Sequence, residues 1–326
     1  MSSTTNHLPA KTRIRLPDLP PAVFQHPLDA AATATLRRVR GFDRLVSLFL
    51  EYGFERLQYV HNMSGSIRVT ERQLPQLLGM LRESCEVMGV PEPELYVQQG
   101  EVNAYTAGHN HPYIVLLSGL LDTMNDEEIM GVIAHEVGHI KCGHVLYKQM
   151  SRGIVPFLDL VGKATLGVGA LVGMGVESAL LVWDRRSELS ADRAALLVMQ
   201  DVNVCNSMLM KIAGGGHRFA EELVLEEFLN QAKKYREDTE DESKLDKFYR
   251  FIAGSKANHP FAIERCHALL EWEESGEYEN VLAGTYIQTA SPSPPQLSPS
   301  ASCRNCASAL FPGSKFCSAC GKSQAL

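Results

Sequence analysis

The chain has 326 residues and a net charge of −7, with 45% hydrophobic and 21% charged residues. This length allows about two domains of roughly 150 residues each, and the composition is that of a folded rather than a disordered protein. The negative charge argues against a broad basic surface for nucleic acids. The first 21 residues are polar and rich in proline, without the apolar run of a secretory signal, so we expect no such signal.

Eight cysteines could suggest a framework of disulfides, but their positions indicate otherwise. Four are scattered through the body of the chain, and four form two close pairs, Cys303 with Cys306 and Cys317 with Cys320. Such pairs are typical of metal sites, and metal thiolates require a reducing compartment. We therefore expect an intracellular, cytoplasmic protein.

Proline and turn residues divide the first third of the chain. Five prolines among residues 1–30 predict an extended N-terminal arm. Apolar residues at helical spacing then favour helices up to about residue 90. Short strands are predicted over 94–98 and 113–117, with turn residues between them at Asn103, Gly108 and Asn110.

Two long helices are predicted in the middle of the chain. Asn125 can cap the first, because Glu128 follows three residues later, and we expect this helix to reach His144 or slightly beyond. The second contains residues 188–199, and the glycines at 214–216 should interrupt the segment that follows it.

Residues 164–183 form a stretch of 20 residues with one charge, Glu177. This stretch is long enough to span a bilayer, but it is rich in glycine and alanine, which also suit close helix packing. The sequence leaves two alternatives open: contact with a membrane, or a helix pair that is buried or caps the surface.

Serine and proline make up eight of the ten residues 291–300. This composition predicts a flexible linker, which we place at 285–301. The linker separates the body of the chain, residues 31–284, from a cysteine-rich end at 302–326.

His135, Glu136 and His139 form an HExxH motif inside the first long helix. Histidines four residues apart lie on one face of a helix, so both imidazoles can reach one zinc ion. Glu136 would lie beside the metal, where it can take a proton from a water whose pKa zinc lowers. The alternative is a chance motif with two solvated histidines.

A catalytic zinc needs a third protein ligand and an open fourth position. A metzincin continuation would need glycine and histidine where this chain has Cys142 and Val145. Glu188 is a candidate ligand, and Asp192 on the same helix face could accept the outer N–H of a ligand histidine. The alternative is that both are ordinary solvated acids.

The motifs HEVGH at 135–139 and ELSAD at 188–192, together with NAY at 103–105, resemble the HtpX and CAAX prenyl endopeptidase family of zinc metallopeptidases. The resemblance covers roughly residues 73–270. Membrane members of that family carry strong transmembrane helices before the HExxH motif, and this chain has none there. The resemblance is therefore to a largely soluble relative, and processing of prenylated proteins is not implied.

The resemblance implies a gluzincin with a zincin-like fold. His135, His139 and Glu188 would bind the zinc, and Glu136 would act as general base and later as proton donor. Asn103 would lie on the strand that holds the substrate backbone.

A histidine–arginine pair further along the chain also matches the family. His259 would stabilise the developing oxyanion, and Arg265 would brace the site or a carboxylate within it. The alternative for His259 is a cap before Pro260. His144 lies off the ligand face of a continuous helix, and we expect it to be structural.

The last 25 residues contain two CxxC pairs separated by ten residues. Four thiolates at this spacing close a tetrahedral structural zinc site and resemble a short zinc ribbon. Free cysteines or disulfides are the alternative. We expect the ribbon to bind a protein partner or a substrate, because its few basic residues offer little to nucleic acid.

These observations together predict a mainly α (α+β) metallopeptidase with a small β-sheet beside the active-site helix and a C-terminal zinc ribbon. The expected activity is hydrolysis of peptide bonds in proteins or peptides, in protein quality control, with one catalytic and one structural zinc. Two alternatives are an inert adaptor that uses the ribbon, and a protease that becomes active when residues 164–183 meet lipid.

Overall fold

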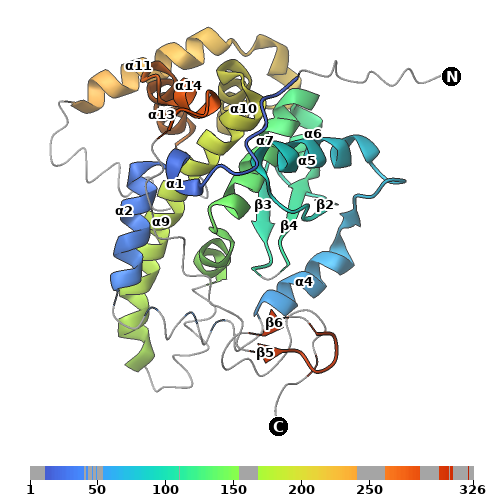
Figure 1. Ribbon diagram of the computed structural model, residues 1–326. Helices are drawn as coiled ribbons and strands as arrows, with labels where there is room; N and C mark the ends of the chain where they lie inside the picture. Colours follow the sequence, from blue (N-terminus) through green and yellow to red (C-terminus); the bar gives the residue numbers. More distant parts are fainter. Residues whose placement is uncertain are drawn as a thin grey trace.

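The computed structural model describes residues 12–39, 42, 46, 49, 54–109, 111–153, 168–240, 261–286, 301–307, 309–310 and 322. Helices predominate, and a small mixed sheet lies beside them (Figure 1). The helices in these ranges are α1 (Pro21–Phe24), α2 (Pro27–Arg38), α4 (Phe54–Gly65), α5 (Pro75–Met88), α6 (Ser118–Thr123), α7 (Asp126–Lys141), α9 (Val168–Met199), α10 (Val202–Gly214), the 3-10 helix η1 (His217–Glu222), α11 (Leu225–Glu240), α13 (Ala262–Glu274) and α14 (Glu277–Leu282). Residues 145–153 are also helical. The strands are β1 (Ile67–Arg68), β2 (Glu94–Gln98), β3 (Ala104–Ala107), β4 (Tyr113–Leu117), β5 (Ala301–Ser302) and β6 (Ala309–Leu310).

The main sheet has the strand order β1-β2-β4-β3, with β2 and β4 parallel and the outer strands antiparallel to them. The strands β2 and β4 have the predicted bounds. The edge strand β3 lies between the predicted turn residues Asn103 and Gly108, and only the family resemblance, which placed Asn103 on a strand, pointed to it. A strand of four residues has little local signal, and its extended form depends on pairing with β4.

Helix α7 begins as its sequence predicts. The side chain of Asn125 accepts a hydrogen bond from the Glu128 N–H, and the Glu128 carboxylate accepts one from the Asn125 N–H. The helix ends at Lys141, short of the predicted His144, because Gly143 adopts φ +71°. Glycine takes this left-handed conformation without the steric cost that a side chain imposes, so it ends the helix and turns the chain.

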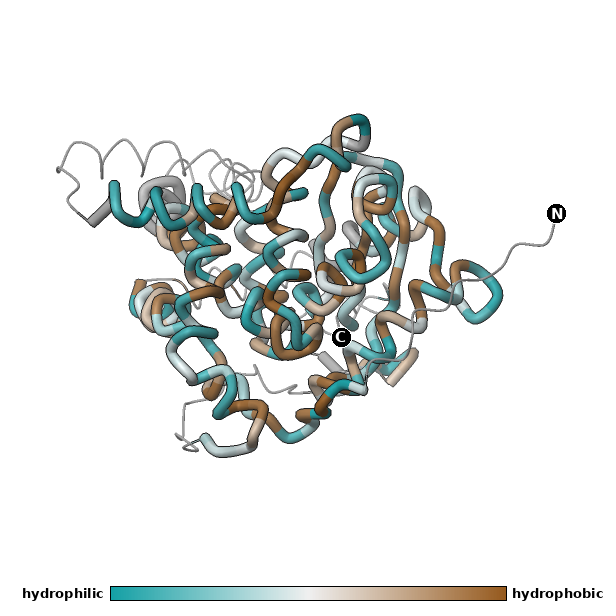
Figure 2. The backbone as a smooth tube through the Cα atoms, turned by 90° about the horizontal axis from the view of Figure 1, so that it is seen from above, coloured by the Kyte–Doolittle hydropathy of each residue, from teal (hydrophilic) through white to brown (hydrophobic). Residues whose placement is uncertain are grey.

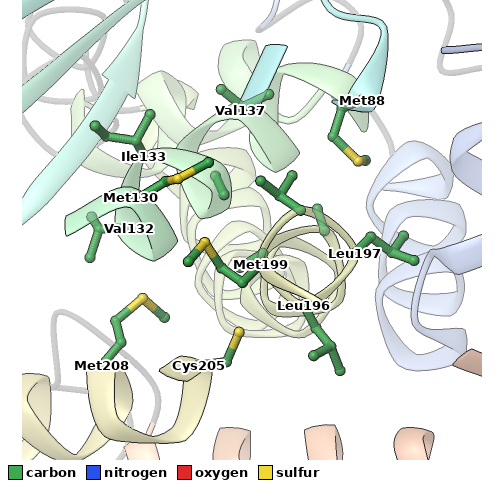
Figure 3. Packing of buried hydrophobic residues seen from close by; sticks show 14 of the residues in the cluster. Met88, Met130, Val132, Ile133, Val137, Leu196, Leu197, Met199, Cys205 and Met208 are labelled. Carbon is green, nitrogen blue, oxygen red and sulfur yellow. The ribbon is translucent and has the colours of Figure 1, made fainter. Parts of the chain in front are cut away.

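Helices α7 and α9 pack closely and carry the centre of the core. The buried side chain of Met130 on α7 lies beside Met199 of α9, with Met208 of α10 close by (Figure 3), and all three belong to the main apolar cluster. Along the backbone, hydrophobic and hydrophilic residues alternate within the helices, as expected of helices with one buried face (Figure 2). This packing holds the motif on α7 against the second motif on α9.

The apolar stretch 164–183 contributes to α9 from Val168 onward, and residues 164–167 lie outside the described residues. Val176, Leu180 and Trp183 are buried in a second apolar cluster that also contains Leu36 of α2. Within the described parts of the chain, none of the helices combines the length and apolar character needed to cross a membrane.

The N-terminal segment differs from the expected extended arm. Residues 21–24 and 27–38 form α1 and α2, and Leu19 and Phe24 are buried in the main core. Helix α2 lies along α9 (Figure 1). The expectation is wrong for residues 21–30 because proline at the first position of each helix favours helix initiation there.

The C-terminal end is described only in part. Strands β5 and β6 pair as a short antiparallel ribbon that flanks Cys303 and Cys306. The predicted linker at 291–300, together with Cys317 and Cys320, lies outside the described residues.

Candidate active site

Three buried side chains from α7 and α9 form a cluster that could hold a metal ion. One donor atom from each of His135, His139 and Glu188 lies within 4.8 Å of the others. The Nε2 atoms of His135 and His139 are each 3.3 Å from an oxygen of Glu188. Tetrahedral zinc ligands at about 2.0–2.1 Å from the metal are about 3.3–3.4 Å apart, so the donor types and the two histidine–glutamate distances fit zinc.

The ring of His135 is oriented by Asp192. The His135 Nδ1 atom is 3.0 Å from Asp192 Oδ1, so with the proton on Nδ1 the ring donates to the carboxylate and Nε2 is free to bind a cation. Arg265 donates to both oxygens of Asp192, through Nε at 2.7 Å and Nη2 at 2.5 Å. Burial lowers the pKa of His135, but Asp192 and Glu188 raise it more, to about 9, so a proton competes with a cation for this site.

The ring of His139 is oriented by a longer chain of contacts. Its Nδ1 atom is 3.0 Å from Nδ1 of His144, and Nε2 of His144 is 3.1 Å from Asp29 Oδ2 on α2. Burial and the nearby Lys148 lower the pKa of His139 well below its usual value. The neutral imidazole is the form that binds a metal.

Glu188 is fixed by a buried lysine. Lys148 donates to Glu188 Oε1 at 2.5 Å and pairs with Asp184 at 2.8 Å. The Arg265 guanidinium is 3.3 Å from the other oxygen of Glu188. Sequence reasoning missed Lys148, because a lysine in a helix is normally exposed and nothing in its spacing relates it to Glu188.

Glu136 lies beside the cluster and is itself buried. The hydroxyl of Thr106 on β3 donates to Glu136 Oε2 at 2.5 Å. This bond ties the carboxylate of the expected general base to the edge strand. Sequence reasoning missed Thr106, since the resemblance placed only Asn103 on a strand here and nothing in the spacing relates Thr106 to Glu136.

A small cleft, partly open to solvent, adjoins these residues. His135, Glu136 and Glu188 are among its polar lining residues. Its apolar lining residues are Val102, Leu120, Val132, Met208 and Ile212. The cleft therefore presents apolar side chains next to the candidate metal ligands.

The start of β3, the outer strand of the sheet in the described part of the chain, borders this cleft. Asn103 lies directly before β3 and lines the cleft, and its carbonyl accepts from the N–H of Leu117 on β4. Because residues of an antiparallel strand alternate in direction, the backbone groups of Ala104 and Thr106 face away from β4. The side chain of Asn103 binds the Ala104 N–H, and Arg152 binds the Thr106 carbonyl.

The structure thus brings together seven of the residues singled out in the sequence: Asn103, His135, Glu136, His139, Glu188, Asp192 and Arg265. His259 lies outside the described residues. His144, expected to be merely structural, contacts a ligand candidate because the turn at Gly143 returns it to His139.

Comparison with known proteins agrees with this geometry. The model of Peptidase family M48 matches residues 71–273. The chain belongs to peptidase family M48. It is accordingly a zinc metallopeptidase, and the resemblance noted in the sequence is confirmed. Its mostly helical structure with a small mixed sheet is that expected of a zincin-like fold.

Individual M48 relatives are similar over different parts of the chain. Plastoglobule-localized metallopeptidase 48, chloroplastic, of Arabidopsis thaliana is 35% identical over 81% of this chain and 76% of its own length. Protease HtpX homologues from Ralstonia nicotianae and Tropheryma whipplei are 25% and 29% identical, over 53% and 37% of this chain. These matches span 66% and 45% of the two homologues, so this chain covers less than two thirds of each. No solved structure matches.

Proposed function

We propose that this M48 peptidase is an endopeptidase in which Glu136 is the general base and later the proton donor. The observation that carries the proposal is the pairing of a His135, His139 and Glu188 donor set with a buried carboxylate in one cleft. Zinc at this site would polarise the scissile carbonyl and lower the pKa of the attacking water.

The remaining steps belong to side chains of this chain. Glu136 takes the proton of the attacking water and passes it to the leaving amine. Thr106 holds the Glu136 carboxylate in place, while Asp192 and Arg265 keep His135 in the tautomer that binds metal through Nε2. His259 is proposed as the donor to the developing oxyanion, on the resemblance alone.

The test compares Glu136→Gln with the wild-type protein and with Glu127→Gln, a carboxylate on the same helix that is not part of the cluster. We expect Glu136→Gln to retain zinc and to lose hydrolysis of casein, and Glu127→Gln to keep both. Turnover by a zinc-loaded Glu136→Gln enzyme would refute the assigned role.

We propose unfolded or damaged proteins as the substrates, which would place the enzyme in protein quality control. An extended peptide could add as a further strand at the outer edge of β3, where it would displace the Asn103 side chain from the Ala104 N–H and Arg152 from the Thr106 carbonyl. Folded proteins seldom expose such a segment, and unfolded chains supply it. Casein should therefore be cleaved, while a stably folded protein of similar size should be cleaved only after it is unfolded.

We further propose that Cys303, Cys306, Cys317 and Cys320 bind a structural zinc in a ribbon that recruits a protein partner. Among the described residues, the N–H of Asn305 donates to Cys303 Sγ at 3.4 Å, and Ala307 N–H to the Cys303 carbonyl at 2.9 Å. This tight turn directs a backbone donor at the sulfur, as suits a metal thiolate. Wild-type protein should hold two zinc ions per chain, and a Cys303→Ser, Cys306→Ser variant one.

We propose a cytoplasmic, reducing location for the enzyme, with membrane contact at 164–183 as the alternative outcome of the test. The buried thiols of Cys85, Cys142 and Cys266 are not bridged, which suits such a compartment. Cell fractionation tests this proposal. Val182 is an exposed valine in the described part of this stretch. If the enzyme is recovered in the membrane fraction, and Val182→Asp abolishes that recovery, the alternative is favoured.

A further inference from the structure

The two histidine ligand candidates are oriented in different ways. Asp192 contacts His135 directly and is itself paired with Arg265. Among the described residues, the Nδ1 atom of His139 contacts no carboxylate but the imidazole of His144, whose far nitrogen contacts Asp29. Asp29 comes from α2, more than a hundred residues earlier in the chain.

We propose that Asp29, acting through His144, is a positioning residue for His139, so that helix α2 forms part of the metal site. The inference rests on the proposed zinc site. It assigns a role to the N-terminal segment that neither the HExxH motif nor the second motif on α9 predicts.

The first support is that the contacts allow one consistent placement of protons. To bind a metal through Nε2, a neutral His139 must carry its proton on Nδ1 and donate it to His144. Nδ1 of His144 then accepts, so the proton of His144 lies on Nε2 and is donated to Asp29. The chain ends in a carboxylate that only accepts, which fixes the direction of both bonds.

The second support is the way in which Asp29 is held. Its side chain is fully buried, and it accepts from Ser190 Oγ at 2.6 Å, Gln25 Nε2 at 2.9 Å and Thr33 Oγ1 at 3.2 Å. A buried carboxylate is costly unless it is hydrogen-bonded and paired. Among the described residues, no lysine or arginine forms an ion pair with Asp29. The basic side chain that contacts its carboxylate is His144, with Nε2 3.1 Å from Oδ2.

The third support is that the middle member of the chain is rigid. The His144 ring is 3% exposed and packs edge-on against Trp183 of α9, with the ring centroids 5.4 Å apart. Trp183 in turn donates to Thr33 Oγ1 of α2. Helices α2 and α9 therefore hold His144 from both sides, and a shift of α2 would be transmitted to His139.

The test measures zinc affinity by competition with a chelator, in full-length protein that carries Cys303→Ser and Cys306→Ser so that the ribbon does not contribute. Asp29→Asn removes the charge and keeps the shape. His144→Phe cuts the chain and keeps the packing against Trp183. Asp18→Asn is the matched control, because it removes an exposed carboxylate from the same segment.

We expect Asp29→Asn to weaken zinc binding about tenfold and His144→Phe by about 10–100-fold, the usual range for groups that orient a metal ligand. The double variant should bind zinc no more weakly than His144→Phe alone, because both changes interrupt one chain. Asp18→Asn should leave the affinity unchanged.

The proposal is overturned if Asp29→Asn binds zinc as tightly as Asp18→Asn, or if the effects of the two substitutions add. If His144→Phe does not fold, the comparison of Asp29→Asn with Asp18→Asn still decides the question. If the Cys303→Ser, Cys306→Ser protein with Asp29 intact binds no zinc, the metal site itself is refuted. If that protein binds zinc and Asp29→Asn does not weaken the binding, only the role of Asp29 is refuted.

Discussion

Gly138, inside the HExxH motif, sets the distance between the two helices that carry the metal donors. A Cβ atom added at Gly138 would lie 2.5 Å from the Cβ of Ala194 and 3.2 Å from the Cα of Ala191 on α9. Carbon atoms in contact normally stay about 3.5–4.0 Å apart. In a Gly138→Ala variant, α7 and α9 must therefore separate by about 1 Å.

The effect on folding stability should be modest. Overpacking of this kind costs about 1–3 kcal/mol, and the higher helix propensity of alanine offsets about 1 kcal/mol of that. We expect the free energy of unfolding to fall by about 0–2 kcal/mol, so the variant should remain folded.

The effect on the metal site should be larger, because His139 and Glu188 face each other across the same helix pair. Their donor atoms are 3.3 Å apart, and two donors on one zinc ion cannot be more than about 4.1 Å apart. A separation of about 1 Å along this direction would take the pair beyond that limit. Zinc affinity, measured by chelator competition, should fall at least tenfold.

Two controls isolate the contact. In Gly131→Ala, also on α7, the new Cβ would lie 3.3 Å from the flexible end of Met208 and in ordinary contact with Met199 at 3.8 Å, so zinc binding should not change. Adding Ala194→Gly to Gly138→Ala removes the closest clash and should restore part of the affinity. If Gly138→Ala binds zinc as tightly as the wild type, and adding Ala194→Gly does not change the affinity, the contact between Gly138 and Ala194 does not control the metal site.

Three further predictions concern neighbouring contacts. Thr106→Val should lower kcat about tenfold or more with little change in KM or zinc content, since it deletes a hydrogen bond to the Glu136 carboxylate. Thr106→Ser keeps the hydroxyl and should have the kcat of the wild type. Equal kcat values in the wild type and both variants would contradict this role of Thr106. Burial raises the pKa of Asp192, but Arg265 and His135 lower it below its usual 3.8. This carboxylate therefore stabilises the fold above about pH 4 and loses that contribution as the pH falls further. In metal-free protein, the free energy of unfolding of Asp192→Asn should fall less steeply with decreasing pH than that of the wild type. Identical pH slopes would show that Asp192 does not contribute to the acid dependence of stability. Asn125→Ala should lower the free energy of unfolding by about 1 kcal/mol in thermal denaturation, through loss of the capping box, whereas the neighbouring Asp122→Ala should have little effect.

Features that depend on neighbouring residues could be predicted from the sequence. The start of α7 follows from Asn125 and Glu128, which are three residues apart, and His135 and His139 share a face because of the period of the helix. Strands β2 and β4 have a β-branched and aromatic composition that favours extended backbone by itself.

Other features needed contacts between distant parts of the chain. The strand β3 exists by pairing with β4, and Thr106 reaches Glu136 only once that strand is in place. The helices of the N-terminal segment are stabilised by burial of residues such as Leu19 and Phe24 in a core that later residues build.

The sequence by itself therefore determined the family, the mainly helical class and the three metal-binding candidates, because these depend on short spacings and on motifs that are read locally. Only the tertiary structure decided what orients them. Asp29, Lys148 and Thr106 reach the site through folding, and a single turn at Gly143 redirects His144 toward His139. A hydrogen bond between residues far apart in the chain leaves no periodic signal, so its partners become known only when packing brings them within 3 Å or so.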